Sequence, residues 1–226
     1  MKFTFYGHAC FSLEINGKTI LFDPFITPNE AAKDIDLKSI KADYILVSHG
    51  HGDHLADCVA MAMQTGALVV SNPEVLAWLG KQGVKNTHPI NHGGKKTFDF
   101  GTVKAVNAIH SSGLPDGSYG GNPLGFVITS SEKNIYYSGD TALTMDMQLI
   151  PHWAKLDAAI LCLGDNFTMG YEDAILAAEM IGCKKIIGVH FDTFPYIKID
   201  HQQVEEAFKN AGLTLSLPKI GEQLEL

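Results

Sequence analysis

The sequence has 226 residues, a formal net charge of −8, 46% hydrophobic residues and 19% charged residues. This is the composition of an ordinary globular protein, which excludes a disordered or fibrous chain, and the length allows a large buried core. All 17 basic residues are lysines, so no arginine is present to bind phosphate groups through two parallel hydrogen bonds. The acidic balance and the lack of arginine argue against a nucleic acid as the main partner.

The four cysteines are scattered along the chain, which predicts neither a disulfide framework nor a zinc ribbon. The chain opens on a strand-like segment without an apolar leader, and no stretch reaches the roughly 20 apolar residues of a membrane helix. We therefore expect a soluble cytoplasmic protein with no membrane partner.

Short apolar, β-branched and aromatic runs predict a β-rich start, followed by alternating strands and helices. Asn16-Gly17 is a strong hairpin signal between the second and third strands. In the first half we predict strands at Lys2–Tyr6, Cys10–Ile15, Thr19–Phe22, Tyr44–Val47 and Ala67–Val70, and helices at Leu55–Gln64 and Pro73–Leu79.

The second half repeats this order of a β-rich stretch followed by β and α in alternation. The glycine-rich segment Ser111–Asn122 is predicted to be a mobile loop or lid. We predict strands at Lys96–Phe100, Thr102–Ile109, Leu124–Thr129, Asn134–Ser138, Ala158–Leu163, Lys185–Val189 and Thr214–Leu217, and helices at Tyr171–Ile181 and Ile199–Asn210. The repetition indicates an α/β fold of two similar halves, packed sheet to sheet with helices outside.

The segment Ser48–His54 has the pattern H-x-H-x-D-H between a predicted buried strand and a predicted helix. A chain with this His and Asp content would contain the pattern by chance on the order of one time in a thousand. Its potential metal ligands are His49, His51, Asp53 and His54. Two interspersed glycines let the backbone curl, so that alternate side chains converge on metal.

Three further candidate ligands stand at the ends of predicted strands downstream. They are His110, Asp140 and His190. Because the carboxyl ends of neighbouring strands share one edge of a sheet, these side chains are expected to meet in a common cleft.

The order of these motifs resembles the metallo-β-lactamase superfamily over essentially the whole chain. The resemblance implies a single domain, residues 1–226, with the four-layer αββα sandwich and mixed sheets of that family. It also implies that His49, His51 and His110 hold one metal, that Asp53, His54 and His190 hold the other, and that Asp140 bridges them. Smaller motifs, among them Gly7–Cys10 and Leu21–Pro24, are similar to uncharacterised metal-dependent hydrolases related to ascorbate-6-phosphate lactonases.

The implied cofactor is a pair of divalent ions, expected to be Zn²⁺, although Mn²⁺, Fe²⁺ or Ni²⁺ fit such N/O ligands as well. Water between two such ions has its pKa lowered to about 7, which supplies a nucleophile at neutral pH. Asp53 is expected to take or relay the proton of that nucleophile.

Four other residues are candidates for a role in the site, and each also has an ordinary structural interpretation. His8, in a turn between strands, is either a substrate-binding or proton-transfer residue or a structural histidine. Asp23 either orients a ligand histidine or caps a turn. Asp165 and Asn166, which follow a predicted buried strand, either line the pocket or are ordinary loop residues.

The leading prediction is a metal-dependent hydrolase that cleaves an ester, lactone or related bond of a small molecule. A phosphorylated sugar acid is not carried over as substrate, since such a ligand usually requires arginine. The alternatives are a phosphodiesterase or nuclease of the same fold, a di-iron oxidoreductase of the same fold and a metal-binding protein without activity. Assembly as a homo-oligomer is left open.

Overall fold

A computed structural model describes residues 1–226. Fourteen strands form two seven-stranded sheets, each of which is antiparallel in one half and parallel in the other. The first sheet has the order β14-β1-β2-β3-β4-β5-β6. Its strands are β1 (Lys2–Gly7), β2 (Cys10–Ile15), β3 (Lys18–Phe22), β4 (Tyr44–Leu46), β5 (Leu68–Ser71), β6 (Thr87–Pro89) and β14 (Gln223–Glu225).

The second sheet has the order β13-β12-β11-β10-β9-β8-β7 and repeats the pattern of the first. Strands β7 to β10 are antiparallel, and β10 to β13 are parallel. The strands are β7 (Lys95–Thr97), β8 (Thr102–Asn107), β9 (Leu124–Thr129), β10 (Asn134–Tyr137), β11 (Ala158–Cys162), β12 (Lys185–Val189) and β13 (Thr214–Ser216). The prediction of two similar halves is thereby confirmed at the level of sheet topology.

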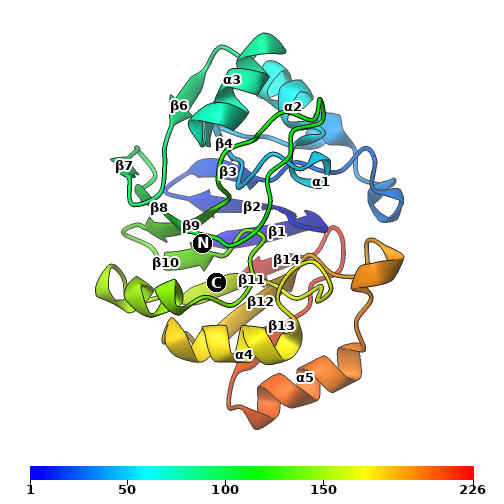
Figure 1. The fold of residues 1–226 in the computed structure, drawn as a ribbon, viewed down its shortest axis with the longest axis vertical. Coiled ribbons are helices and arrows are strands. Elements are labelled where there is room, and N and C mark those ends of the chain that lie inside the picture. Colours follow the sequence, from blue (N-terminus) through cyan, green and yellow to red (C-terminus); the bar gives the residue numbers. More distant parts are fainter.

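Helices cover the outer face of each sheet, which gives four layers in the order helix, sheet, sheet, helix (Figure 1). The first sheet carries α1 (Gly52–Leu55), α2 (Cys58–Thr65) and α3 (Pro73–Lys81), and the second carries α4 (Tyr171–Met180), α5 (His201–Asn210) and the 3-10 segment η3 (Met145–His152). Three shorter 3-10 turns are η1 (Glu30–Ala32), η2 (Leu37–Ser39) and η4 (Pro195–Ile197). None of these helices is long and apolar enough to cross a membrane.

The central strands are buried on both faces, because alternate side chains enter different cores. In β10, Ile135 and Tyr137 face the core between the two sheets, whereas Tyr136 packs under the outer helices. In β3, Ile20 likewise enters the inter-sheet core and Leu21 packs under α2 and α3. Strands buried on both faces need apolar residues at every position, which explains the unbroken apolar runs in the sequence.

The continuous helix predicted at Leu55–Gln64 is wrong, since the segment folds as two helices, α1 and α2. The break falls at Asp57, whose carboxylate accepts hydrogen bonds from the backbone N–H groups of Ile26, at 2.6 Å, and Thr27, at 2.8 Å. These long-range bonds fix the chain where the apolar pattern alone would continue the helix.

The glycine-rich loop Ser111–Asn122 is fixed to the body of the protein at several points. Ser112 Oγ accepts a hydrogen bond from the Gly50 N–H at 3.0 Å and donates one to the Gly120 carbonyl oxygen at 2.9 Å. Asn72, which caps α3, donates from Nδ2 to the same carbonyl oxygen at 2.8 Å. The loop is therefore a hydrogen-bonded part of the wall beside the H-x-H-x-D-H segment.

Candidate metal centre

The chemistry-bearing side chains predicted from the sequence gather at one edge, where strands of both sheets end. The H-x-H-x-D-H segment follows β4, His110 follows β8, Asp140 follows β10 and His190 follows β12. At Gly139, with φ of +60°, an added Cβ would lie 2.5 Å from the carbonyl oxygen of Leu124. A glycine is therefore needed there to turn the chain and deliver Asp140 to this edge.

His49, His51 and His110 form the first cluster, in which one potential ligand atom from each lies within 4.8 Å of the others. His49 Nε2 is 3.0 Å from His51 Nδ1, and the His110 ring stands roughly perpendicular to both, at 88° and 78°. Three imidazoles converging on one point form the nitrogen-rich donor set that zinc and similar ions prefer.

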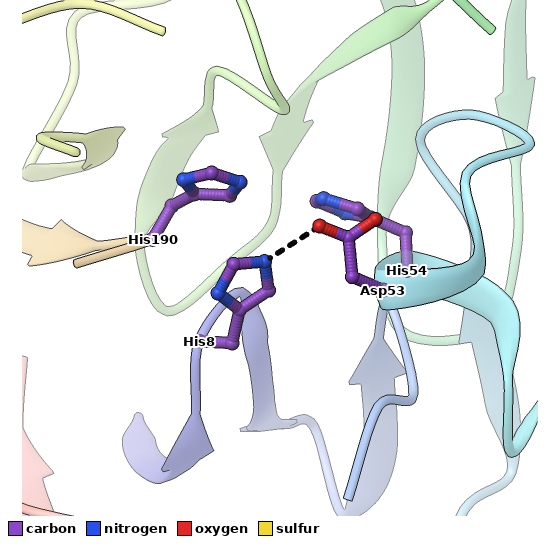
Figure 2. A group of neighbouring side chains, drawn as sticks. All are labelled: His8, Asp53, His54 and His190. Atoms are coloured by element: carbon purple, nitrogen blue, oxygen red, sulfur yellow. Dashed lines mark hydrogen bonds and ion pairs between the residues drawn. The ribbon is translucent and has the colours of Figure 1, made fainter. Parts of the chain in front are cut away.

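Asp53, His54 and His190 form the second cluster, to which the structure adds His8. Figure 2 shows the four side chains directed toward a common centre from three separate segments. His8 Nε2 lies 3.1 Å from Asp53 Oδ2, and its Nδ1 lies 3.0 Å from Thr193 Oγ1. His8 is therefore a buried member of the cluster, and both of its ring nitrogens contact side chains.

Asp140 lies between the two clusters. Its Oδ2 is 2.9 Å from His190 Nε2, 3.2 Å from His54 Nε2 and 3.7 Å from His110 Nε2. The carboxylate is almost fully buried, and its Oδ1 has no hydrogen-bond partner. A buried carboxylate oxygen without a donor is costly, and a cation is the partner that would satisfy it.

The ionisation of the histidines also suits a metal. Burial lowers the pKa of His49, His51 and His110 and outweighs the nearby carboxylates, which raise it, so these rings are neutral at neutral pH. Neutral imidazole is the form that donates a lone pair to a metal ion. His54 differs: burial opposes its protonation, but Asp140 and Asp23 raise its pKa well above the ordinary value. The two carboxylates thus favour a positive charge beside them. In the metal-free protein protonated His54 carries that charge, and a bound metal ion would carry it instead.

Asp23 is placed as the carboxylate that orients a histidine of the cluster. It is fully buried at the end of β3, and its Oδ2 accepts hydrogen bonds from His54 Nδ1 at 2.9 Å, Ser48 Oγ at 2.7 Å and Tyr137 OH at 2.6 Å. Its Oδ1 accepts the Ser48 backbone N–H at 2.7 Å. Because the carboxylate can only accept, His54 carries a proton on Nδ1, and its Nε2 faces Asp140.

Asp165 and Asn166 do not line the pocket, which corrects that expectation. Both have positive φ, 53° and 40°, and the tight turn they form leaves their side chains exposed. The next residue, Phe167, lines the cavity instead. This cavity of about 250 Å³ is lined by His51, Asp53, His110, Ser111, Asp140, Phe167, His190 and Phe194.

The sequence did not predict the residues whose side chains contact the donor residues and Asp23. Ser48 lies within the motif segment, and its Oγ is 2.9 Å from His49 Nδ1, a contact that the motif itself does not indicate. Tyr137 and Thr193 are far from the motif in the chain and carry no local signal. Phe194 also lines the cavity, but nothing in the sequence around it indicates a pocket wall.

Comparisons with known proteins identify the family of the chain. A family model described as a beta-lactamase superfamily domain matches residues 2–190. A UPF0173 metal-dependent hydrolase of Flavobacterium johnsoniae is 57% identical over 226 residues, and the alignment covers both chains completely. Igni18, a metallo hydrolase of the archaeon Ignicoccus hospitalis, superposes with a TM-score of 0.89 at 31% identity, covering 100% of this chain and 98% of that one.

An isothiocyanate hydrolase from Delia radicum gut bacteria superposes with a TM-score of 0.79 at 23% identity, covering 100% of this chain and 99% of that one, and shares the fold alone. Fold, donor groups and relatives together define a metal-dependent hydrolase. The chain belongs to the metallo-β-lactamase superfamily, with the αββα fold of that family.

Proposed function

We propose that this hydrolase holds two zinc ions and cleaves an ester or lactone bond of a small molecule. The observation that supports the proposal most is the position of Asp140 between two separate donor clusters, with Oδ2 toward histidines of both. His49, His51 and His110 would hold one ion, Asp53, His54 and His190 the other, and Asp140 would be shared.

Two zinc ions in this place would lower the pKa of water to about 7 and polarise the carbonyl oxygen of a substrate. Asp53 lines the cavity and is held by its hydrogen bond with His8. Burial raises the pKa of Asp53, but the hydrogen bond from His8 and the charge of His54 outweigh it and hold the pKa well below the ordinary value. Asp53 is therefore ionised at neutral pH, as a metal ligand must be, and its place on the cavity wall would let it accept a hydrogen bond from the attacking water. His8 acts through Asp53 by fixing the orientation of its carboxylate.

The metal content of purified variants tests the two-ion assignment. Elemental analysis of zinc-loaded protein should give about two zinc ions per chain for the wild type. His110→Ala and His190→Ala should each lose about one ion, and Asp140→Ala should lose at least one. His152→Ala is the matched control, because His152 is exposed on η3 and belongs to neither cluster. Full occupancy in the three ligand variants would overturn the assignment.

A substrate screen tests the bond type. Zinc-loaded protein is offered lactones, carboxylic esters, phosphodiesters, thioesters and β-lactams, with Asp140→Ala as the inactive reference. Hydrolysis of the first two classes supports the proposal, whereas exclusive hydrolysis of phosphodiesters would replace it with the phosphodiesterase alternative. Protein from defined medium that retains iron rather than zinc, with visible absorption, would favour the di-iron alternative.

A further inference from the structure

The cavity wall that remains after the metal-binding side chains are set aside is small and largely aromatic. Of the eight lining residues, five belong to the donor clusters or to Asp140, which leaves Ser111, Phe167 and Phe194 to contact the rest of a substrate. No lysine lines the cavity, and the chain contains no arginine. The wall therefore offers two aromatic rings and one hydroxyl group, but no cationic side chain apart from the histidines.

The two phenylalanines are held differently. Phe194 is half-buried. Its ring packs edge-on against the His8 ring, with centroids 5.3 Å apart, and lies at a tilt to the buried Phe25 ring, with centroids 6.3 Å apart. Phe167 is 52% exposed and has Tyr196 as its aromatic neighbour, with ring centroids 6.1 Å apart. One ring is thus a fixed wall beside the second cluster, and the other is an apolar surface open to the cavity.

The charge of the site also restricts which groups a substrate can carry. Two divalent ions would leave a net positive charge among their carboxylate ligands, so an anionic group can bind at the metals themselves. A negative group elsewhere on the substrate would face aromatic rings without a cation to neutralise it, and burying it there would be costly. An exposed aromatic ring at a site mouth is instead suited to stacking with a flat apolar group.

We propose that the substrate of this site carries a neutral, flat, apolar group, such as a benzene ring, that packs against Phe167 and Phe194 while its scissile carbonyl lies at the donor clusters. The proposal rests on the proposed function for the bond that is cleaved. It assigns Phe167 and Phe194 as the residues that determine specificity, and it excludes substrates with an anionic group remote from the reacting carbonyl.

Three γ-butyrolactones of similar intrinsic reactivity test this assignment: γ-phenyl, γ-methyl and γ-(4-carboxyphenyl). In each reaction water adds to the carbonyl carbon, the bond from that carbon to the ring oxygen breaks, and the ring oxygen takes up a proton to give the hydroxy acid. We expect the zinc-loaded wild type to prefer the phenyl over the methyl lactone by about tenfold in kcat/KM, and to disfavour the carboxyphenyl lactone by a similar factor.

The variants separate specificity from catalysis. Phe167→Ala and Phe194→Leu should remove most of the preference for phenyl over methyl, chiefly through a higher KM for the phenyl lactone. Phe167→Lys should raise the kcat/KM of the carboxyphenyl lactone relative to the phenyl lactone by about tenfold. Trp153→Leu is the control, because Trp153 is an exposed aromatic residue that does not line this cavity. A wild type that prefers the anionic lactone, or Phe variants that leave all ratios unchanged, would overturn the proposal.

A binding measurement distinguishes failure of this inference from failure of the proposed function. 5-Phenylpyrrolidin-2-one replaces the ring oxygen of the phenyl lactone with N–H and serves as a ligand for calorimetric titration of the zinc-loaded protein. If no lactone is hydrolysed, but this lactam binds and its affinity falls about tenfold in Phe167→Ala and Phe194→Leu, the bond type is wrong and the substrate class stands. Absence of binding, or equal affinity in all variants, would overturn the substrate class.

Discussion

Oδ2 of Asp23 lies 2.9 Å from Nδ1 of His54, and both side chains are fully buried. The pair joins the end of β3 to α1 across 31 residues of chain. It holds a proton on Nδ1 of His54 and directs Nε2 toward Asp140, 3.2 Å away. Asp23 therefore controls a candidate metal ligand without lining the cavity.

We predict that Asp23→Ala weakens zinc binding about 10- to 100-fold, as measured by titration against a competing chelator. The same change should lower the free energy of unfolding in urea by about 3–5 kcal/mol, because His54, Ser48 and Tyr137 lose a buried acceptor. Asp34→Ala, at an exposed carboxylate outside the donor clusters, serves as the control for both measurements. Unchanged zinc affinity with lowered stability would leave Asp23 a purely structural role.

Neighbouring tyrosines in β10 provide a matched pair. Tyr137 OH donates to Asp23 Oδ2 at 2.6 Å, whereas the hydroxyl group of Tyr136 is equally buried and has no partner. Tyr137→Phe should lower the free energy of unfolding by about 1.5–3 kcal/mol, the typical range for a hydrogen bond to a charged group. Tyr136→Phe should be neutral or slightly stabilising. Equal losses in the two variants, measured by urea unfolding, would contradict this view of the network.

The pH dependence of metal-free protein follows from His8. Burial lowers its pKa to about 4, despite the nearby Asp53, while in the unfolded chain the value is about 6.5. As the pH falls, the unfolded state therefore takes up the proton first. The contribution of neutral His8 to the free energy of unfolding is complete above pH 6.5 and is lost as the pH falls toward 4. Between pH 7.5 and 5.5 the loss amounts to about 1.4 kcal/mol.

His8→Gln, which does not titrate, should show a stability loss between these two pH values that is smaller than that of the wild type by this amount. Urea unfolding in the presence of a chelator measures both proteins. A wild type and variant with the same pH dependence would show that His8 is not buried as a neutral ring.

Asn72 has two tasks that substitution can separate. Its Oδ1 accepts the Val75 N–H at 2.9 Å to cap α3, and its Nδ2 donates to the carbonyl oxygens of Gly120 and Asn122 at 2.8 and 3.2 Å. Asn72→Ser keeps a capping oxygen but loses both donors, so it should destabilise the protein by about 1–3 kcal/mol. We expect faster proteolysis within residues 113–121 and faster amide exchange there, with little change in α3. Faster exchange throughout α3 instead would show that the serine hydroxyl does not replace the cap.

The candidate metal ligands could be predicted from the sequence better than the residues that surround them. His49 and His110 were recognisable because strand ends and a dense His/Asp motif are local signals. Asp57 was not, because its carboxylate interrupts a helix through bonds to residues 30 and 31 positions earlier. Phe167 was missed in favour of its two predecessors, since the direction of a loop side chain depends on backbone angles that the loop sequence did not reveal.

Strand β14 is a whole element that the sequence pattern did not predict. It is three residues long and pairs with β1 in an antiparallel ladder, with Phe3 opposite Leu224. Three residues carry too little pattern to predict a strand, and only the edge of the folded sheet selects this segment. The short strand β6 was missed for the same reason.

Each donor cluster draws on both halves of the chain. His49 and His51 come from the half built on the first sheet and His110 from the half built on the second, and His54 and His190 are divided in the same way. An ion bound in either cluster therefore fastens one half to the other. At a free metal concentration of 1,000 times Kd, each such ion would add about 4 kcal/mol to the free energy of unfolding. The concentration of free metal would then set the stability of the contact between the two halves as well as the rate of turnover. Chains without metal would be the ones whose two sheets separate most readily.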